Sequence, residues 1–199
     1  MKHRTILLFG APGSGKGTQG KVLANIPGFF HCACGDIFRN LKVDSQLGRV
    51  FVEHSSKGQL VPDDATVRLW SDFIQTSIKV GRYRPDKDLL VLDGIPRSLA
   101  QARILKDVLD VRAMFWLKTR DIEALVHRIQ RRALRENRLD DMNLDVIRTR
   151  FKTYEKETQP LVEYYGKKLV HRIDSDHTPV EVCRDILAKI IKLGIQPSI

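Results

Sequence analysis

Apolar and polar positions follow two different periods along this chain. Five short apolar runs, bounded by glycine, proline or polar residues, have the length and composition of buried strands. They are Thr5–Phe9, Phe29–Ala33, Leu89–Leu92, Ala113–Leu117 and Leu169–Ile173. The segments between them carry apolar residues at helical spacing. This alternation predicts an α/β fold with a three-layer core, in which helices cover a five-stranded parallel sheet.

Local signals indicate where several helices begin or break. Asp121 is placed to cap the helix that follows it, and Thr178 with Glu181 forms a capping box next to a proline. The amphipathic stretch 144–161 contains Pro160, which we expect to kink or divide it. No repeat or interdomain linker interrupts the pattern, so residues 1–199 are interpreted as a single domain.

The connection between the second and third predicted strands is longer than one crossover needs. Helical patterns at Asp36–Leu41, Leu47–Lys57 and Thr66–Ile78 predict an inserted helical lobe there. A second candidate insertion, short and polar, lies at Ala133–Asp141. Small lobes of this kind are what an enzyme needs to close over its substrates.

The segment GAPGSGKGTQ, residues 10–19, joins the first predicted strand to a helix. Its glycines allow the backbone N–H groups to converge on an anion, and Lys16 adds a positive charge at the rim. The segment matches the phosphate-binding P-loop, except that Gly17 follows the lysine and the hydroxyl comes one residue later, at Thr18. The alternative is an ordinary glycine-rich turn with a surface lysine.

The charge of the chain changes which partners are expected. Its formal net charge is +10, which points to anionic partners, either nucleic acid or small molecules bearing phosphate. No run of consecutive Lys or Arg resembles a nucleic-acid tail, which favours the small molecules. The sequence shows neither a long apolar span nor a signal peptide, so we expect a cytoplasmic protein without a membrane segment.

The three cysteines do not indicate a disulfide framework or a zinc site. Cys32, Cys34 and Cys183 are odd in number and contain no C-x-x-C pair. We therefore expect Cys32 and Cys183 to be buried free thiols.

The stretch LLVLDGIPRS, residues 89–98, ends a predicted buried strand in Asp93. A carboxylate at this edge of the sheet, near the P-loop, is well placed to hold Mg²⁺ or its water shell. A strand-terminal aspartate in a turn is the alternative interpretation. Arg97 follows four residues later, so a base and an acid would both face one phosphate site.

Residues 128–150 carry seven arginines and four carboxylates. One interpretation is a solvated, salt-bridged hairpin, which we favour for Arg131, Arg135 and Arg148. The other is that arginine side chains close over phosphoryl oxygens, whose spreading negative charge fixed donors stabilise. The candidates for this second role are Arg128, Arg132, Arg138 and Arg150.

Together these motifs resemble the adenylate kinase family of the short-LID type. The resemblance rests on GAPGSGKGTQ, on CGDIFR at 34–39, on GQLVPD at 58–63, on LDGIPRSLAQA at 92–102 and on the arginine-rich hairpin. It covers nearly the whole chain. It implies a P-loop NTPase-type core, a helical NMP-binding lobe at about 35–67, a short LID at about 132–142, and γ-phosphoryl transfer from Mg·ATP to AMP.

The resemblance also implies a role for each matching position. The implied catalytic residues are Lys16, Arg39, Arg97, Arg132, Arg138 and Arg150. ATP would be bound by Gly13, Ser14, Gly15, Lys16, Gly17, Thr18 and Arg128. AMP would be bound by Cys34, Gly35, Arg39, Leu60, Val61, Gly94, Arg97 and Gln101, and Asp93 would hold Mg²⁺ through water. ATP and AMP would be the partners of a monomer that binds neither nucleic acid nor membrane.

The sequence departs from the family pattern at four points. Cys34 stands where adenylate kinases usually have threonine and the pyrimidine relatives have alanine, and Ile95 replaces a phenylalanine. The stretch from Arg138 to Arg150 is one residue longer than expected, which leaves the alignment of Arg138 open. The fourth point is the lack of zinc-binding cysteines, which fits a short LID.

The sequence leaves open which base the acceptor nucleotide carries. The amide of Gln101 suits adenine, because it donates to N1 and accepts from the 6-amino group, but cytosine presents a similar edge. The resemblance favours AMP, since UMP/CMP kinases carry asparagine at this position. A UMP/CMP kinase, or a non-catalytic P-loop protein binding nucleotides or nucleic acid, remains the alternative.

Overall fold

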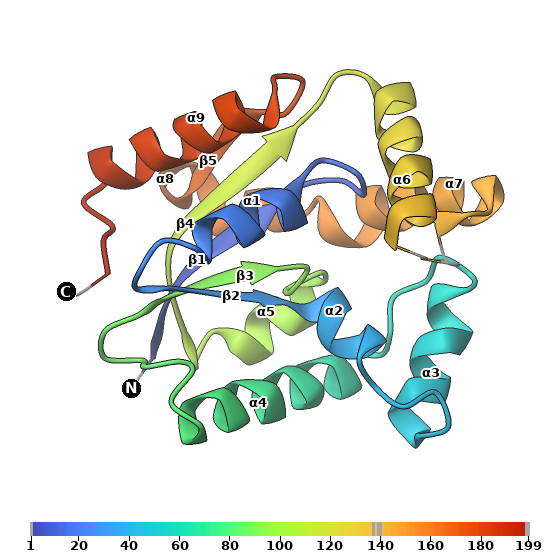
Figure 1. Cartoon of the computed structure of the whole chain (residues 1–199), viewed down its shortest axis with the longest axis horizontal. Helices are drawn as coiled ribbons and strands as arrows, with labels where there is room; N and C mark the ends of the chain where they lie inside the picture. The colour runs from blue at the N-terminus through green and yellow to red at the C-terminus, as the bar shows by residue number, and fades with distance from the viewer. Residues whose placement is uncertain (1, 137, 139–140, 198–199) are drawn as a thin grey trace.

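The predicted parallel sheet is present in the computed structural model, which describes residues 2–136, 138 and 141–197. Its five strands lie in the order β2-β3-β1-β4-β5 (Figure 1). They are β1 His3–Phe9, β2 Phe29–Ala33, β3 Leu89–Asp93, β4 Leu109–Lys118 and β5 Val170–Asp174. The chain passes to one side of β1 for β2 and β3 and to the other for β4 and β5. Open parallel sheets bind ligands where the strand order reverses in this way.

Helices cover both faces of the sheet and complete the three layers. Helices α1 Lys16–Leu23 and α9 Pro179–Lys192 pack on one face, and α4 Asp63–Lys79, α5 Leu99–Leu105 and α8 Leu161–Leu169 pack on the other. Successive side chains of a strand point to opposite faces. Ile6 and Leu8 accordingly enter the core beneath α1 and α9, whereas Leu7 and Phe9 enter the other core. The predicted fold class is confirmed.

Strand β4 is longer than the apolar pattern predicted, because it begins at Leu109 rather than at Ala113. Its first half contains two charged residues that interrupt the apolar run. Arg112 is the additional residue of a bulge, where the register against β1 shifts, and its guanidinium pairs with Asp110 at 3.2 Å. The fifth strand also starts later than predicted: Leu169 is the last residue of α8, and β5 begins at Val170.

The expected helix starts are present. The side chain of Asp121 accepts a hydrogen bond of 2.9 Å from the backbone N–H of Ala124, in the first turn of α6 Ile122–Glu136. Thr178 and Glu181 form the reciprocal capping box of α9. Each cap satisfies backbone donors that the first turn of a helix leaves unpaired.

The amphipathic stretch 144–161 is divided, as the proline predicted. Helix α7 Leu144–Thr153 is followed by a π-helical turn, η2 Tyr154–Thr158, and α8 begins directly after Pro160. Proline has no N–H to continue the helical hydrogen bonds of the preceding turn. The division brings Tyr154 and Thr158 to the wall of the cavity described below.

The long connection after β2 contains α2 Cys34–Arg39 and α3 Gln46–Ser55 before α4. Figure 1 shows α2 and α3 beyond the carboxyl end of the sheet, on the same side as α6 and α7. Helix α4 instead belongs to the core layer, because Trp70 and Ile74 are buried against the sheet. The helical pattern at 66–78 was therefore wrongly grouped with the inserted lobe.

The boundaries of the two lobes stay predictions. The lobe at about 35–67 would end just after the first turn of α4. The LID at about 132–142 would begin inside α6, and its residues 137, 139 and 140 lie outside the described residues.

All three cysteines are free thiols. Cys32 is buried on β2, as expected, and burial raises the pKa of its thiol. Cys183 is only partly buried, so that expectation was wrong: it lies next to Val182, which takes the inward position on α9. Among the described residues, no helix has the length and apolar character needed to span a membrane.

Candidate active site

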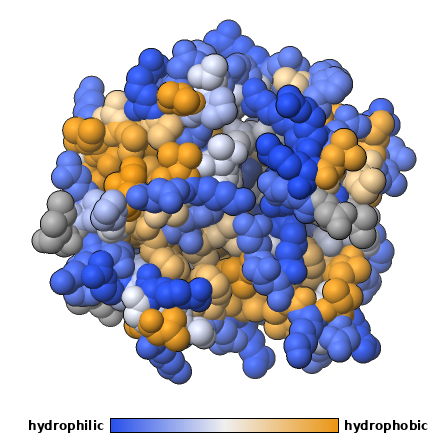
Figure 2. Space-filling model, in the orientation of Figure 1, coloured by the Kyte–Doolittle hydropathy of each residue, from blue (hydrophilic) through white to orange (hydrophobic). Residues whose placement is uncertain are grey.

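A cavity of about 1110 Å³ opens at the carboxyl end of the sheet. Its wall is built by the loop after β1, by α2, by the loop after β3 and by α6 and α7. Figure 2 shows hydrophilic residues over much of α6 on the face drawn there. A cavity of this volume exceeds what one small ligand usually occupies.

Every residue that the sequence singled out for binding or catalysis lines this cavity. They are Gly13, Ser14, Gly15, Lys16, Gly17, Thr18, Cys34, Gly35, Arg39, Leu60, Val61, Asp93, Gly94, Arg97, Gln101, Arg128, Arg132, Arg138 and Arg150. They come from segments that are far apart in the sequence, between residues 13 and 150, so the fold brings them together. Their individual roles stay predictions.

The P-loop turns β1 into α1 through residues that only glycine fits. Gly13 and Gly15 have positive φ angles of 80° and 94°, a conformation that residues with a Cβ rarely adopt. A Cβ on Gly13 would also lie 2.8 Å from the carbonyl oxygen of Leu125 in α6. The hydroxyl of Ser14 is buried inside this loop with no hydrogen-bond partner among the described residues. Such an unsatisfied buried donor is typical of a site that binds an anion.

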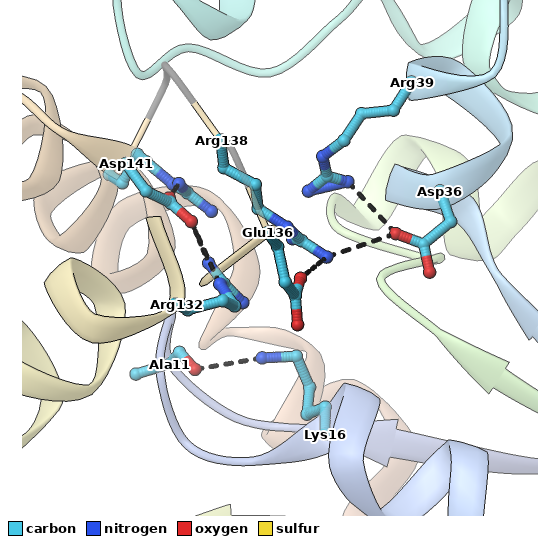
Figure 3. Close-up of polar contacts among 9 residues, drawn as sticks. Ala11, Lys16, Asp36, Arg39, Arg132, Glu136, Arg138 and Asp141 are labelled. Atoms are coloured by element: carbon cyan, nitrogen blue, oxygen red, sulfur yellow. Dashed lines mark hydrogen bonds and ion pairs between the residues drawn. The ribbon is translucent and has the colours of Figure 1, made fainter. Parts of the chain in front are cut away.

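The side chain of Lys16 bends back into the P-loop. Its Nζ donates a hydrogen bond of 2.7 Å to the carbonyl oxygen of Gly10 and one of 2.9 Å to that of Ala11. Figure 3 shows the bond to Ala11. Burial lowers the pKa of Lys16 to about 8; the nearby Asp93 opposes this shift, and Arg97 adds to it. The ammonium charge is therefore costly to maintain without an anion nearby.

Asp93 ends β3 beside the first turn of α1. A Cβ on Gly17 would lie 3.5 Å from its Oδ2 atom, an ordinary van der Waals distance, so the carboxylate lies next to the P-loop backbone. Within the described part of the chain, no group of three or more His, Cys, Asp or Glu side chains is arranged to hold a metal ion. Mg²⁺ is usually held by one or two carboxylates together with water and substrate phosphates, and a lone carboxylate next to a phosphate loop fits that arrangement.

Two arginines on different helices share one buried carboxylate. The Nε and Nη2 atoms of Arg132 donate to Oδ2 of Asp141 at 3.0 and 2.6 Å, and Arg150 contacts Oδ1 of the same residue. Asp141 is fully buried. Two bonds from neighbouring guanidinium nitrogens to one charged oxygen restrain the orientation of the Arg132 side chain. Asp141 thus ties α6 to α7 and orients both arginines at the cavity wall.

A second carboxylate joins the arginine-rich hairpin to α2. Oδ1 of Asp36 lies 3.4 Å from both Arg39 and Arg138, and Arg138 also pairs with Glu136 at 2.7 Å. Figure 3 shows these guanidinium groups together with Arg132 around the space next to Lys16. Four positive side chains from three segments therefore converge on one region.

Arg97 and Cys34 lie on the opposite wall. The guanidinium of Arg97 folds over Gly94, where a Cβ would be 2.8 Å from Nη2, and its carbonyl oxygen accepts a hydrogen bond of 2.7 Å from Thr158. Cys34 is buried, and burial raises the pKa of its thiol to about 11. It therefore stays a neutral thiol near neutral pH. Ile95, the departure from the phenylalanine of the family, is buried beneath this wall.

The amide of Gln101 is held on both sides. Oε1 accepts a hydrogen bond of 2.7 Å from the backbone N–H of Arg97, and Nε2 donates one of 2.7 Å to Oδ1 of Asp63. The hydroxyl of Ser98 also donates to this oxygen, at 2.9 Å. Asp63 was not recognised in the sequence, because an acidic residue in the first turn of a helix is ordinary.

Other residues of the cavity were also missed or misjudged. Arg131 and Arg135, expected on a solvated surface, are exposed but line the cavity, whereas Arg148 pairs with Asp145 on the surface as expected. The counter-ions Asp36, Glu136 and Asp141 were not identified. The only signal for them was their position among the arginines.

Comparison with known proteins identifies the family. The adenylate kinase family model matches residues 8–170. An adenylate kinase of Flavobacterium psychrophilum is 36% identical over 186 residues, which cover 90% of this chain and 94% of that protein. Adenylate kinases of Parabacteroides distasonis and Flavobacterium johnsoniae are 36% and 38% identical, each over 80% of this chain and 83% of the relative. The chain therefore belongs to the adenylate kinase family, whose members are nucleotide-dependent phosphotransferases.

Proposed function

We propose that this protein transfers the γ-phosphoryl group of ATP reversibly to AMP and so produces two ADP. The observation that carries the proposal is the convergence of Lys16, Asp93 and the arginines of α2, α6 and α7 on one cavity. A transferring phosphoryl group spreads negative charge over its oxygens, and fixed positive donors stabilise that charge. The volume of about 1110 Å³ supports two nucleotides bound end to end.

The P-loop side of the cavity is the proposed donor site. The backbone N–H groups of residues 13–18 would hold the β- and γ-phosphates of ATP, with the Thr18 hydroxyl beside them. Lys16 would exchange its bonds to the loop carbonyls for bonds to the phosphates and follow the transferred group. Arg128, whose Nη1 donates to the carbonyl oxygen of Ser175 at 3.0 Å, would stack on the donor adenine.

The opposite wall is the proposed acceptor site. Arg39 and Arg97 would grip the α-phosphate of AMP, which places its oxygens in line with the donor phosphate. Gln101 would read the adenine edge, and Leu60, Val61, Cys34, Gly35 and Gly94 would surround the nucleotide. Near neutral pH the thiol of Cys34 adds no charge there, because its pKa is raised to about 11.

The arginine pairs suggest how the site is completed. Arg132, Arg138 and Arg150 contact Asp141, Asp36 and Glu136. We propose that phosphoryl oxygens displace or share these partners when the lobe at 35–67 and the LID at 132–142 close. Closure would also exclude the water that hydrolyses an exposed phosphoryl donor.

Mg²⁺ bound with ATP would neutralise the developing charge on the phosphates and help to align them. Asp93 is the residue that would hold its water ligands. We further propose that the enzyme acts as a monomer, because one chain supplies every residue of the site. A cytoplasmic location is proposed from the free thiols.

The proposal is tested with Mg·ATP and a panel of AMP, CMP, UMP and GMP as acceptors, by measuring ADP formation. We expect AMP to have the highest kcat/KM. Faster phosphorylation of CMP or UMP would assign the protein to the pyrimidine kinases. No transfer to any of the four would contradict a nucleoside monophosphate kinase.

A further inference from the structure

We propose that Asp63 is a positioning residue that fixes the orientation of the Gln101 amide and thereby selects the acceptor base. This inference rests on the proposed function, since it assumes that Gln101 meets the base of the acceptor nucleotide. The amide of a glutamine has an oxygen that only accepts and a nitrogen that only donates hydrogen bonds. Its two orientations therefore recognise opposite patterns on a base edge.

The neighbours of Gln101 allow only one orientation. The backbone N–H of Arg97 is a donor and so requires Oε1 at 2.7 Å, whereas the carboxylate of Asp63 is an acceptor and requires Nε2 at 2.7 Å. If the amide were reversed, two donors would face each other at Arg97 and two acceptors at Asp63. The bond to the charged carboxylate is the stronger of the two constraints.

Asp63 is itself held in place. It is the first residue of α4, where the helix N-terminus favours a negative charge. Its Oδ1 also accepts from the hydroxyl of Ser98 at 2.9 Å, and that hydroxyl accepts from the backbone N–H of Gln101 at 3.1 Å. The three side chains thus form a closed network that joins α4 to the start of α5.

The network leaves one defined face of the amide for a ligand. Gln101 is buried and lines the main cavity, whereas Asp63 is not part of the cavity wall. Among the described residues, Oε1 and Nε2 each have one side-chain or backbone partner, so each keeps one further bonding position. Asp63 therefore acts through Gln101 rather than by touching the nucleotide.

The fixed amide fits a base whose edge combines an amino group with an unprotonated ring nitrogen. Adenine offers this pair at its 6-amino group and N1. Hypoxanthine has the same ring system but reverses both groups, since it carries a carbonyl oxygen at position 6 and a hydrogen on N1. A base with that edge would leave the buried amide atoms facing like partners, which a polar site rejects strongly.

The test compares AMP with IMP as acceptors in the wild type, in Asp63→Asn and in the control Asp64→Asn. Asp64 is the next acidic residue in the first turn of α4 and is exposed, so its variant removes the same charge from the same helix end. The wild type is expected to prefer AMP by about a hundredfold or more in kcat/KM. An asparagine at position 63 offers Gln101 either an acceptor or a donor.

Asp63→Asn is therefore expected to lower the ratio of kcat/KM for AMP to kcat/KM for IMP by about tenfold. The change should come mainly from the KM values of the two acceptors, with the KM for ATP unchanged. Asp64→Asn is expected to keep the wild-type ratio within about twofold. General damage to the fold would lower the rates with AMP and IMP together and leave their ratio unchanged. A folded Asp63→Asn enzyme with the wild-type ratio would overturn the inference.

Should Asp63→Asn fail to fold, Ser98→Ala provides the second test. It removes the hydroxyl that holds Oδ1 of Asp63 and is expected to narrow the AMP preference about threefold; an unchanged ratio overturns the inference. The two proposals fail separately. A wild type that phosphorylates neither AMP nor IMP refutes the proposed function and the inference with it. If the wild type phosphorylates AMP but the variants keep its ratio of kcat/KM for AMP to that for IMP, the inference alone is refuted.

Discussion

The ammonium group of Lys16 donates a hydrogen bond to the carbonyl oxygen of Gly10, 2.7 Å away across the P-loop. The lysine is therefore held inside the loop that we propose as the phosphate site, and it makes a further bond to Ala11. Burial favours its neutral form, and an anion in the loop would favour the charged form. Replacing Lys16 therefore tests the proposed catalysis most directly. The protonation of Lys16 should also depend on whether phosphate is bound.

Replacing Lys16 with methionine is expected to lower kcat about a hundredfold or more, because a fixed positive charge is lost at the transferred group. The fold should survive, since Lys16 is the first residue of α1 and its ammonium group bonds to carbonyl groups of the P-loop rather than to the core. Steady-state kinetics and thermal unfolding measure the two effects. Lys192→Met, at the exposed end of α9, is the matched control. Near wild-type turnover in Lys16→Met would contradict the assignment.

The affinity for ATP is expected to depend on pH through Lys16. Its pKa is lowered to about 8 by burial, and bound phosphates would raise that pKa. Affinity is then complete below pH 8 and falls by about tenfold per pH unit as the pH rises through 8 towards the pKa of the bound form. Calorimetric titration with ATP from pH 7 to 9.5 measures this. Lys16→Met should bind more weakly and without this pH dependence, and an equally steep fall in that variant would assign the effect to another group.

The parts of the molecule that repeat a local pattern were predictable from the sequence. The strands follow from apolar runs and α9 from its capping box, and the position of Pro160 predicted the break before α8. Those features depend on residues close together in the chain. Strand β4 was predicted too short because its first half is polar, and its pairing with β1 is a tertiary feature.

Residues of the site could be predicted only where they belong to a recognisable sequence motif. The glycines, Lys16 and the arginines have recognisable spacing, but the carboxylates that orient them do not. Asp63 meets Gln101 across 38 positions, and Asp36 meets Arg138 across 102. Such pairs depend on how α4 packs against α5 and how α2 meets the segment after α6, which no local pattern specifies. The packing of α4 against the sheet was not predicted for the same reason.

Asp141→Asn is expected to destabilise the folded protein by about 2 kcal/mol, because two arginines would lose the buried carboxylate that they share. Chemical denaturation measures this loss. Asp145→Asn is the control: Asp145 pairs with Arg148 on the exposed face of α7, and its loss should cost less than about 0.5 kcal/mol. Equal stability of Asp141→Asn and the wild type would mean that the shared carboxylate contributes nothing.

Gln101→Ala is expected to reduce the advantage of AMP over CMP, because the adenine edge loses its partner. It should also lower stability, since Arg97 and Asp63 lose the hydrogen bonds that the amide makes with them. Acceptor kinetics with both nucleotides measure the change.

Cys34→Thr is expected to change this selectivity little, because it replaces one small neutral side chain of the acceptor wall with another. The wild type and both variants are compared under identical conditions. A larger shift in acceptor preference from Cys34→Thr than from Gln101→Ala would place base selection at Cys34 instead.

The proposed closure predicts a response to a molecule that joins two adenosines through five phosphates. Asp36 already lies 3.4 Å from Arg138, so α2 and the arginine-rich hairpin approach each other across the cavity. A polyphosphate chain between them would bond to Arg39, Arg97, Arg132 and Arg150 at once. We expect it to protect both residues 36–65 of the NMP-binding lobe and the segment 133–141 from hydrogen exchange, whereas AMP alone should protect chiefly the first. Because each lobe would contact a different end of the molecule, protection of neither would mean that the P-loop holds another ligand.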